Sequence, residues 1–462
     1  MVASSMEWAV EEFGSAVLGD VRRVSRLVRI AAGFSDRPAG TVTEAFSSAA
    51  ERRAVYRFLD HQGAHADEVA AAAYGATMDR CGGVDVVFVP VDGSSLNITD
   101  DVRLRGTGPV GARGIGARGF QVMTAIGVAP DGTPLGLLAQ EWWSRAETAS
   151  GRSARRRTTD EKETRYWLSV LDSVRGQFHG ETCRPWFQLD RGGDAWPVLL
   201  ASLRDDIYIT VRAAYDRRVA RRDDDETPPY LWDTLDRQRA LGRFTLEVHG
   251  GPGRKARRAT MEVRATQVTL DTHDTKTKAR HDIPLYAVLA SEVETTPEGE
   301  RPLEWMLLTN RPAVTFEEAR LVVQGYSFRW KIEEFHKIWK TGGCNVEDTQ
   351  LQTEHGIRLL ALMLAAVAMR LFRLTWISRR TPDEPATTEF SHDEIDAVYA
   401  LKETRRVRRH VPSMGTITTW IAELGGYTGK SSGGPPGVIV LTRGLAQVLP
   451  VARALRGRRN AR

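Results

Sequence analysis

Five residues between positions 326 and 340 have side chains and a spacing that could act on a phosphate ester. Spaced 3, 4, 4 and 3 residues apart, they are Tyr326, Arg329, Glu333, Lys337 and Lys340. Each residue of an α-helix advances by about 100°, so this spacing predicts a narrow stripe along one continuous helix. A stripe with one carboxylate, one aromatic ring and three cations suits a ligand that carries phosphate.

The opposite side of the predicted helix is apolar. It carries Phe328, Ile332, Phe335 and Trp339, which we expect to face a hydrophobic core. The neighbouring acid Glu334 is rotated off the stripe, so Glu333 is the acid that faces the ligand. Most amphipathic helices of mixed charge are structural, and a catalytic role therefore needs partners elsewhere in the chain.

Two aspartates provide such partners, because each follows a predicted strand. The apolar run VDVVFVPVD stops at Asp92, before the turn-like GSSLN, and PWFQLD stops at Asp190. An aspartate at a strand end is usually a turn or cap residue, and that alternative holds for either acid alone. Together with Glu333, however, the two would hold two Mg²⁺ ions between carboxylates, as phosphoryl transfer requires.

The elements that must position these acids follow from the hydrophobic pattern. Residues 1–66 read as helices with arginine faces, among them Arg22, Arg23 and Arg26, which we expect to contact DNA phosphates. From residue 84 onward strands dominate, including a hairpin with its turn at 130–132. Five further strand-like runs lie between Asp190 and Tyr326 and predict a β-rich insertion. The apolar run 359–369 is too short to span a bilayer and predicts a buried helix.

Composition places the chain among ordinary soluble proteins. It has 462 residues, 42% hydrophobic and 27% charged, with a net charge of +5. The positive charge is clustered, and the arginine-rich segments suit a polyanion such as nucleic acid; they lie at 22–23, 155–157, 254–258, 405–409 and 456–462. Cys81, Cys183 and Cys344 have no metal-finger or disulfide spacing, so we expect a reducing cytoplasm. The N-terminus has acids where a signal peptide would be apolar.

The stripe also identifies a family resemblance. Its Tyr-x2-Arg-x3-Glu-x6-Lys spacing is similar to the signature of the DDE transposases of the bacterial insertion-sequence-four group. Further segments resemble the same family in the same order: YRFLD, VDGSSL, QEWW, PLEWMLLTN, IEEFHKIWKTG and WIAELGGY. The resemblance covers nearly the whole chain.

The resemblance implies an α/β fold with an RNase H-like catalytic core. It divides the chain into a helical DNA-end-binding domain (1–66), a catalytic domain (67–375, with a β insertion at about 200–312) and a mainly helical dimerisation domain with a basic tail (376–462). It also implies that Asp92, Asp190 and Glu333 bind Mg²⁺, with Mn²⁺ as a substitute. The implied location is the bacterial cytoplasm, at the nucleoid and not at a membrane.

The implied activity is cut-and-paste transposition. A homodimer holds double-stranded DNA with terminal inverted repeats, nicks each end, forms and opens a DNA hairpin, and joins the 3′ ends to target DNA. Trp305 is the position at which the family stacks a base that has left the duplex, which offsets the unstacking energy. From sequence alone a core tryptophan is an equal alternative. Arg212 matches a family arginine near the DNA end.

The sequence departs from the family pattern at two places, and two alternative functions stand beside the transposase interpretation. Pro90 removes a ladder donor from the first catalytic strand and predicts a bulge. Leu441 and Leu445 occupy positions where the family commonly has tryptophans. This departure bears on the implied dimer contacts more than on the catalysis. The first alternative is a transposase descendant that binds DNA without cutting it, which the intact acid triad disfavours. The second, a stand-alone nuclease or phosphatase, would not need the N-terminal helices.

Overall fold

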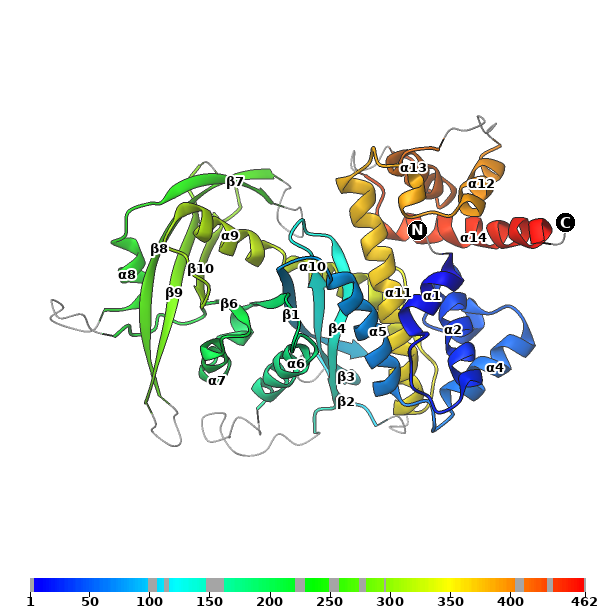
Figure 1. Ribbon diagram of the computed structural model, residues 1–462, viewed down its shortest axis with the longest axis horizontal. Coiled ribbons are helices and arrows are strands. Elements are labelled where there is room, and N and C mark those ends of the chain that lie inside the picture. Colours follow the sequence, from blue (N-terminus) through cyan, green and yellow to red (C-terminus); the bar gives the residue numbers. More distant parts are fainter. Residues whose placement is uncertain are drawn as a thin grey trace. The chain divides into compact units, whose positions relative to one another are not determined.

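The computed structural model describes most of the chain as two compact units. The described residues are 4–98, 106–111, 116–146, 162–220, 229–248, 257–273, 280–294, 296–403, 411–429 and 435–460. Unit 1 comprises Met1–Gly82, Gly93–Thr148 and Ile332–Arg462, and unit 2 comprises Gly83–Asp92 and Ala149–Lys331. The arginine clusters at 155–157 and 405–409, and most of the cluster at 254–258, lie outside the described residues. Figure 1 shows the elements of both units.

Unit 2 is built on a large mixed sheet. In spatial order its strands are β1 (Val86–Asn97), β5 (Arg184–Leu189), β6 (Tyr208–Arg212), β10 (Glu304–Thr309), β9 (Arg280–Glu292), β8 (Arg257–His273) and β7 (Gly242–Val248). The first three are parallel, whereas the pairings from β6 through β10 to β7 are antiparallel. The strands predicted between Asp190 and Tyr326 are therefore confirmed, and they extend the sheet that carries the two aspartates.

The first strand is longer than its sequence predicts. We expected it to end at Asp92, but β1 continues to Asn97, because GSSLN stays extended instead of forming a turn. Its pairing with β5 nevertheless stops at Val91, opposite Leu189. Pro90 lies opposite Gln188 in an unbroken register, so the bulge predicted at Pro90 is absent from this pairing.

Four α-helices accompany the sheet among the described residues of unit 2. They are α6 (Thr164–Gln177), α7 (Trp196–Leu200), α8 (Leu231–Asp236) and α9 (Phe316–Ser327). Thr315 and Glu318 form a capping box that starts α9. Gly325 lets α9 approach the sheet, because a Cβ there would lie 2.4 Å from the ring of Phe88. Both α6 and α9 contact β5.

The prediction of one continuous helix for residues 326–340 is wrong. After α9 ends at Ser327, the chain makes a tight turn with i→i−3 hydrogen bonds, in which the amides of Phe328 and Arg329 donate to Gly325 and Tyr326. The helix α10 (Trp330–Lys337) follows, and a π-helical turn (Ile338–Gly342) ends the segment. The stripe is therefore divided: its first two residues belong to unit 2 and its last three to unit 1.

Unit 1 contains the two helical ends of the chain. Its helices are α1 (Ser5–Phe13), α2 (Val21–Asp36), α3 (Val42–Ala45), α4 (Ala49–Leu59), α5 (Ala66–Cys81), most of α10, α11 (Glu354–Arg380), α12 (His392–Leu401), α13 (Met414–Leu424) and α14 (Val438–Asn460). The predicted hairpin is confirmed as β3 (Arg118–Val128) and β4 (Pro134–Trp143), with the short β2 (Gly108–Pro109) beside β3. The predicted buried helix is confirmed as α11, which contacts α2, α4 and α5 as well as α13 and α14 (Figure 1).

One helix in the described part of the chain has the length and composition of a membrane span. It is the segment Val438–Arg459 of α14. This helix packs along α12 and α13, and it contains Pro450. Some of its apolar residues, among them Leu441, Leu445 and Val448, are buried within unit 1, and a single helix of this kind is weak evidence for a membrane span.

The segment that carries Glu333 is anchored through its apolar side. The Trp339 ring stacks on Phe335 at 5.7 Å and meets Trp142 of β4 edge-on at 5.9 Å. Its indole Nε1 donates a 3.0 Å hydrogen bond to Ala361 O in α11. Ile332, Phe335 and Trp339 are all fully buried, as predicted. Glu333 lies on the other side of α10 and is half-buried.

His336 on α10 makes the stability of the fold sensitive to acid. Burial and the charge of Lys340 lower its pKa from 6.5 to about 3. Between these values the unfolded chain binds a proton that the folded chain does not. The free energy of unfolding should therefore fall by about 1.4 kcal/mol per pH unit as the pH drops below 6.5. Urea titrations at several pH values should show a shallower dependence for His336→Met; an identical slope in both proteins would contradict this assignment.

Candidate active site and DNA-binding region

Strand register places Asp92 beside Asp190 in unit 2. Each follows the last residue of the paired segment, Val91 in β1 and Leu189 in β5. Neighbouring strands lie about 4.8 Å apart, so the two aspartates lie side by side where the pairing of β1 with β5 ends. Because side chains alternate along a strand, Asp92 shares a face with Phe88, whose ring stacks on Trp186 at 5.0 Å. By the same alternation Asp190 lies on the face of Trp186.

The helix α9 covers this face and delivers Arg329 to Asp92. The ring of Phe328, at the end of α9, meets Phe88 edge-on at 5.3 Å. One residue further, Arg329 Nη1 lies 3.5 Å from Asp92 Oδ2. The Arg329 side chain is only 9% exposed and that of Asp92 is 22% exposed, so the pair is largely shielded from water. Arg329 thus balances the charge of one candidate catalytic acid.

Tyr326 lies between two arginines on the same face. Burial raises the pKa of its hydroxyl, while the charges of Arg329 and Arg212 act in the opposite direction. Arg212 follows Val211, which pairs with Leu189, so it lies beside Asp190 across the strands. Burial lowers the pKa of Arg212, and its Nη2 donates to Glu304 O at 2.9 Å. Tyr326 is 2% exposed, so it does not lie on the open stripe that its spacing predicted.

Trp305 packs on the tyrosine from β10. The two rings meet edge-on at 5.2 Å, and Trp305 is 5% exposed. This is the position of a core tryptophan, the alternative that the sequence left open. The base-stacking role stays a prediction, and it requires the indole to become accessible when DNA binds.

Asp190 also caps the turn that follows β5. Its Oδ1 accepts a 2.7 Å hydrogen bond from the amide of Gly192, at the start of a short helical turn, Arg191–Gly193. A Cβ at Gly192 would lie 2.9 Å from this oxygen, so glycine permits the arrangement. The turn fixes one carboxylate oxygen, as expected of a cap residue, and so orients the group.

The donors at this edge suit a hard divalent cation. Both are carboxylates, and oxygen ligands are those that Mg²⁺ prefers. Among the described residues, no three His, Cys, Asp or Glu side chains group closely enough to hold a metal ion. Two acids of the predicted triad are thus neighbours in unit 2, and the third, Glu333, belongs to unit 1.

The remaining residues of the stripe lie with Glu333 in unit 1. Lys340 Nζ donates a 2.6 Å hydrogen bond to Ser95 O and lies 3.3 Å from Glu347 Oε1. Ser95 belongs to the part of β1 that follows Asp92, so Lys340 holds the extension of that strand. Lys337 is exposed. Of the three cations of the stripe, Lys337 is therefore the exposed one, whereas Arg329 and Lys340 already have partners.

The N-terminal helices of unit 1 present two arginine faces. On α2, Arg22 and Arg26 are exposed, whereas Arg23 Nη1 is held by Leu18 O at 2.8 Å. On α4 the exposed side carries Arg53, Tyr56 and Arg57, and these residues line a shallow hollow. The sequence predicts this segment, AERRAVYRFL, as a second basic helix of a DNA-binding module, although the individual DNA contacts predicted for the N-terminal helices are all on α2.

A comparison with known families supports the assignment of DNA binding to the N-terminal helices. Residues 5–64 match the family described as Transposase DNA-binding. This match supports a transposase with DNA as its partner. The matched residues span α1 to α4 and so include both arginine faces. The family suggests nuclease and strand-transferase activity in general terms.

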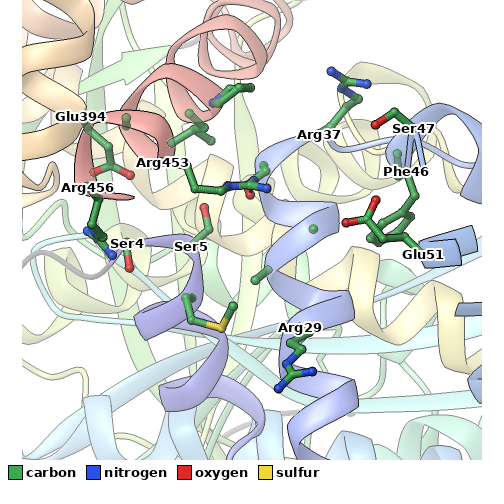
Figure 2. Close-up of a pocket in the computed structure, with 18 of the residues that line it drawn as sticks. Ser4, Ser5, Arg29, Arg37, Phe46, Ser47, Glu51, Glu394, Arg453 and Arg456 are labelled. Atoms are coloured by element: carbon green, nitrogen blue, oxygen red, sulfur yellow. Dashed lines mark ion pairs between the residues drawn. The ribbon is translucent and has the colours of Figure 1, made fainter. Parts of the chain in front are cut away.

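A cavity in unit 1 lies among residues other than the candidate acids. It has a volume of about 610 Å³ and is lined by α1, α2, the start of α4, α12 and α14 (Figure 2). Arg29 lies on α2 and Arg37 directly follows that helix, and Arg453 of α14 forms an ion pair with Asp36. Since serines, arginines and acids line it without a cluster of metal ligands among them, we assign it no part in the chemistry.

Asp194 is a buried residue that the sequence did not single out. Its side chain is fully buried, and its Oδ1 lies 2.5 Å from Arg217 Nη2. Its Oδ2 accepts hydrogen bonds from the amides of Ala214 at 2.7 Å and Tyr215 at 3.2 Å. Asp194 therefore joins the turn after Asp190 to the segment after Arg212. A signal existed in the sequence, because DRGGD places two acids around a glycine turn.

Asp194→Ala should lower the stability of unit 2. The substitution leaves the partly buried Arg217 and two backbone amides without the carboxylate that accepts from them, which we expect to cost about 3 kcal/mol in the free energy of unfolding. Asp172→Ala is the matched control, because Asp172 is 53% exposed and pairs with Arg204 at the surface. That loss should stay below about 1 kcal/mol. Equal losses of the free energy of unfolding in the two variants, measured by chemical denaturation, would contradict the role of Asp194.

Proposed function

We propose that this protein is a DDE transposase of the insertion-sequence-four group that cuts and joins DNA. The observation that carries the proposal is the register of β1 and β5, which makes Asp92 and Asp190 neighbours at one sheet edge. The match of residues 5–64 supports DNA as the substrate. In this proposal the strands around the two acids form an RNase H-like core, and the three-domain division of the sequence holds.

In the proposed site Asp92, Asp190 and Glu333 hold Mg²⁺, with Mn²⁺ as a substitute. When bound, the metal supplies an activated attacking oxygen and neutralises negative charge on the phosphate. The carboxylates of the chain hold and orient it. Arg329 and Arg212 place positive charge at the same edge as Asp92 and Asp190, where it stabilises charge on the scissile phosphate.

Further basic residues are proposed to hold the DNA. Arg22, Arg23 and Arg26 of α2 contact phosphates of the transposon end, and Lys337 and Lys340 contact phosphates near the cut. Such contacts position the duplex without reading its sequence. Tyr326 orients both neighbouring arginines through its hydroxyl.

The proposed reaction is a series of phosphoryl transfers. Water attacks a phosphorus at the transposon end, and the 3′ oxygen leaves as a hydroxyl. That hydroxyl attacks the opposite strand to close a hairpin, a second water opens it, and the 3′ hydroxyl then attacks target DNA. Each step breaks one phosphorus–oxygen bond and forms another. The proposed partners are DNA with terminal inverted repeats, target DNA and a second copy of the chain, at the nucleoid of a bacterial cytoplasm.

Conservative replacement of the acids tests the proposal. Asp92→Asn, Asp190→Asn and Glu333→Gln should each reduce Mg²⁺-dependent nicking roughly a hundredfold or more, because each removes one negatively charged ligand. Binding to the element's terminal DNA, measured by mobility shift, should persist. Glu334→Gln is the matched control, since this neighbouring acid is exposed and lies off the stripe. Normal nicking by Glu333→Gln would refute the triad.

Trp305 should affect the hairpin step more than the first nick. Trp305→Ala should nick at a near-normal rate but accumulate little hairpin, because the displaced base loses its stacking partner. The site is buried, so the change also costs roughly 3–5 kcal/mol of stability, and circular dichroism at the assay temperature must show a folded protein. Trp305→Phe should recover part of the hairpin yield. Unchanged yield in folded Trp305→Ala would refute the stacking role.

A further inference from the structure

The segment that leaves β6 displays an exposed aromatic ring. Among the described residues of unit 2, three aromatic side chains are exposed: Tyr215 at 62%, Tyr230 at 41% and Trp330 at 38%. Tyr215 is the most exposed of them, and it follows Arg212 by only three residues. Large exposed aromatic rings at the ends of strands are commonly binding residues, because they offer apolar area at little loss of entropy.

The ring is exposed but its backbone is fixed. The Tyr215 amide donates to Asp194 Oδ2 at 3.2 Å, and the Ala214 amide donates to the same oxygen at 2.7 Å. On the other side of the tyrosine, Arg217 is bound to Asp194 through both Nε and Nη2. The guanidinium carbon of Arg217 lies 5.4 Å from the centre of the Tyr215 ring. The buried carboxylate of Asp194 and the cation of Arg217 thus hold Tyr215 before any ligand arrives, which lowers the entropy lost on binding. We call the Tyr215 ring, held in this way, the Tyr215 platform.

The platform is joined to the candidate acids by two short pieces of chain. Asp194 follows Asp190 by four residues through the capped turn. Arg212 lies beside Asp190 in the register of β5 and β6, and the next amide, that of Ala213, donates to Met306 O at 2.8 Å. Three residues of extended chain reach about 10 Å, so Tyr215 lies within that distance of Arg212.

We propose that Tyr215 stacks on an unpaired base of the DNA substrate next to the bond that is cut. The inference rests on the proposed function, since it takes DNA as the substrate. Trp305, the aromatic that the family resemblance assigns to base stacking, is buried against Tyr326, whereas Tyr215 is open to a ligand. Stacking on an aromatic ring tolerates any base, so this contact favours unpaired nucleotides over a duplex without reading sequence.

Binding measured without metal separates this contact from cutting. The full-length protein is titrated, in the presence of a chelator, into duplexes carrying the element's terminal sequence. One duplex is blunt, and the other has a single-stranded overhang at the cleavage end with a fluorescent adenine analogue. Tyr215→Ala should lose roughly tenfold in affinity for the overhang duplex and change little on the blunt one. Quenching of the analogue should also be lost.

Three further variants define the contact. Tyr215→Phe and Tyr215→Trp keep a ring and should retain the overhang preference and the quenching. Tyr230→Ala removes another exposed tyrosine beside an arginine, one that Asp194 does not hold, and should behave as wild type. Equal losses on both duplexes, or a Phe variant as weak as Ala, would show a phosphate contact through the hydroxyl and overturn the stacking proposal.

The outcome also separates this inference from the proposed function. A wild-type protein that binds neither duplex would refute both. A protein that binds and nicks DNA, while Tyr215→Ala keeps full overhang preference and quenching, would refute the Tyr215 platform alone.

Discussion

The candidate site depends on the parallel pairing of β1 with β5. This register, which ends at Val91 and Leu189, makes Asp92 and Asp190 neighbours and sends both to the face covered by α9. A slip of one residue would move one aspartate to the opposite face of the sheet. Packing supports the register, because Phe88 stacks on Trp186 and Gly325 leaves room for α9 above them. Two acids far apart in sequence thus become one site.

Two carboxylates at one edge repel each other unless positive charge lies nearby. Arg329 supplies such charge to Asp92, and Arg212 lies beside Asp190 in the register. Tyr326 lies between the two arginines, held by burial and by Trp305. The same cations that balance the acids in the protein alone are those that we propose for the phosphate. The Tyr-Arg part of the signature therefore has a structural reason as well as a chemical one.

Much of this arrangement could be predicted from sequence, because the strands around Asp92 and Asp190 are continuous β-branched or apolar runs. The hairpin, the buried helix α11 and the strands between Asp190 and Tyr326 follow from equally strong patterns. The break after Ser327 was not predicted, since no proline marks it, Gly325 lies within the last turn of α9 and the helical spacing continues across the break. Burial of Tyr326 also escaped prediction, and the sequence left burial of Trp305 as one of two alternatives, because periodicity does not reveal the contact between Trp305 of β10 and Tyr326 of α9.

The central claim is that Asp92 and Asp190 are ligands of one metal site. Crystals of the protein bound to its terminal DNA and soaked in Mn²⁺ would test it through anomalous scattering. The account predicts manganese bound by the carboxylates of Asp92 and Asp190, with Glu333 as a further ligand. Manganese bound elsewhere, with these carboxylates still paired to arginines in the DNA complex, would contradict it.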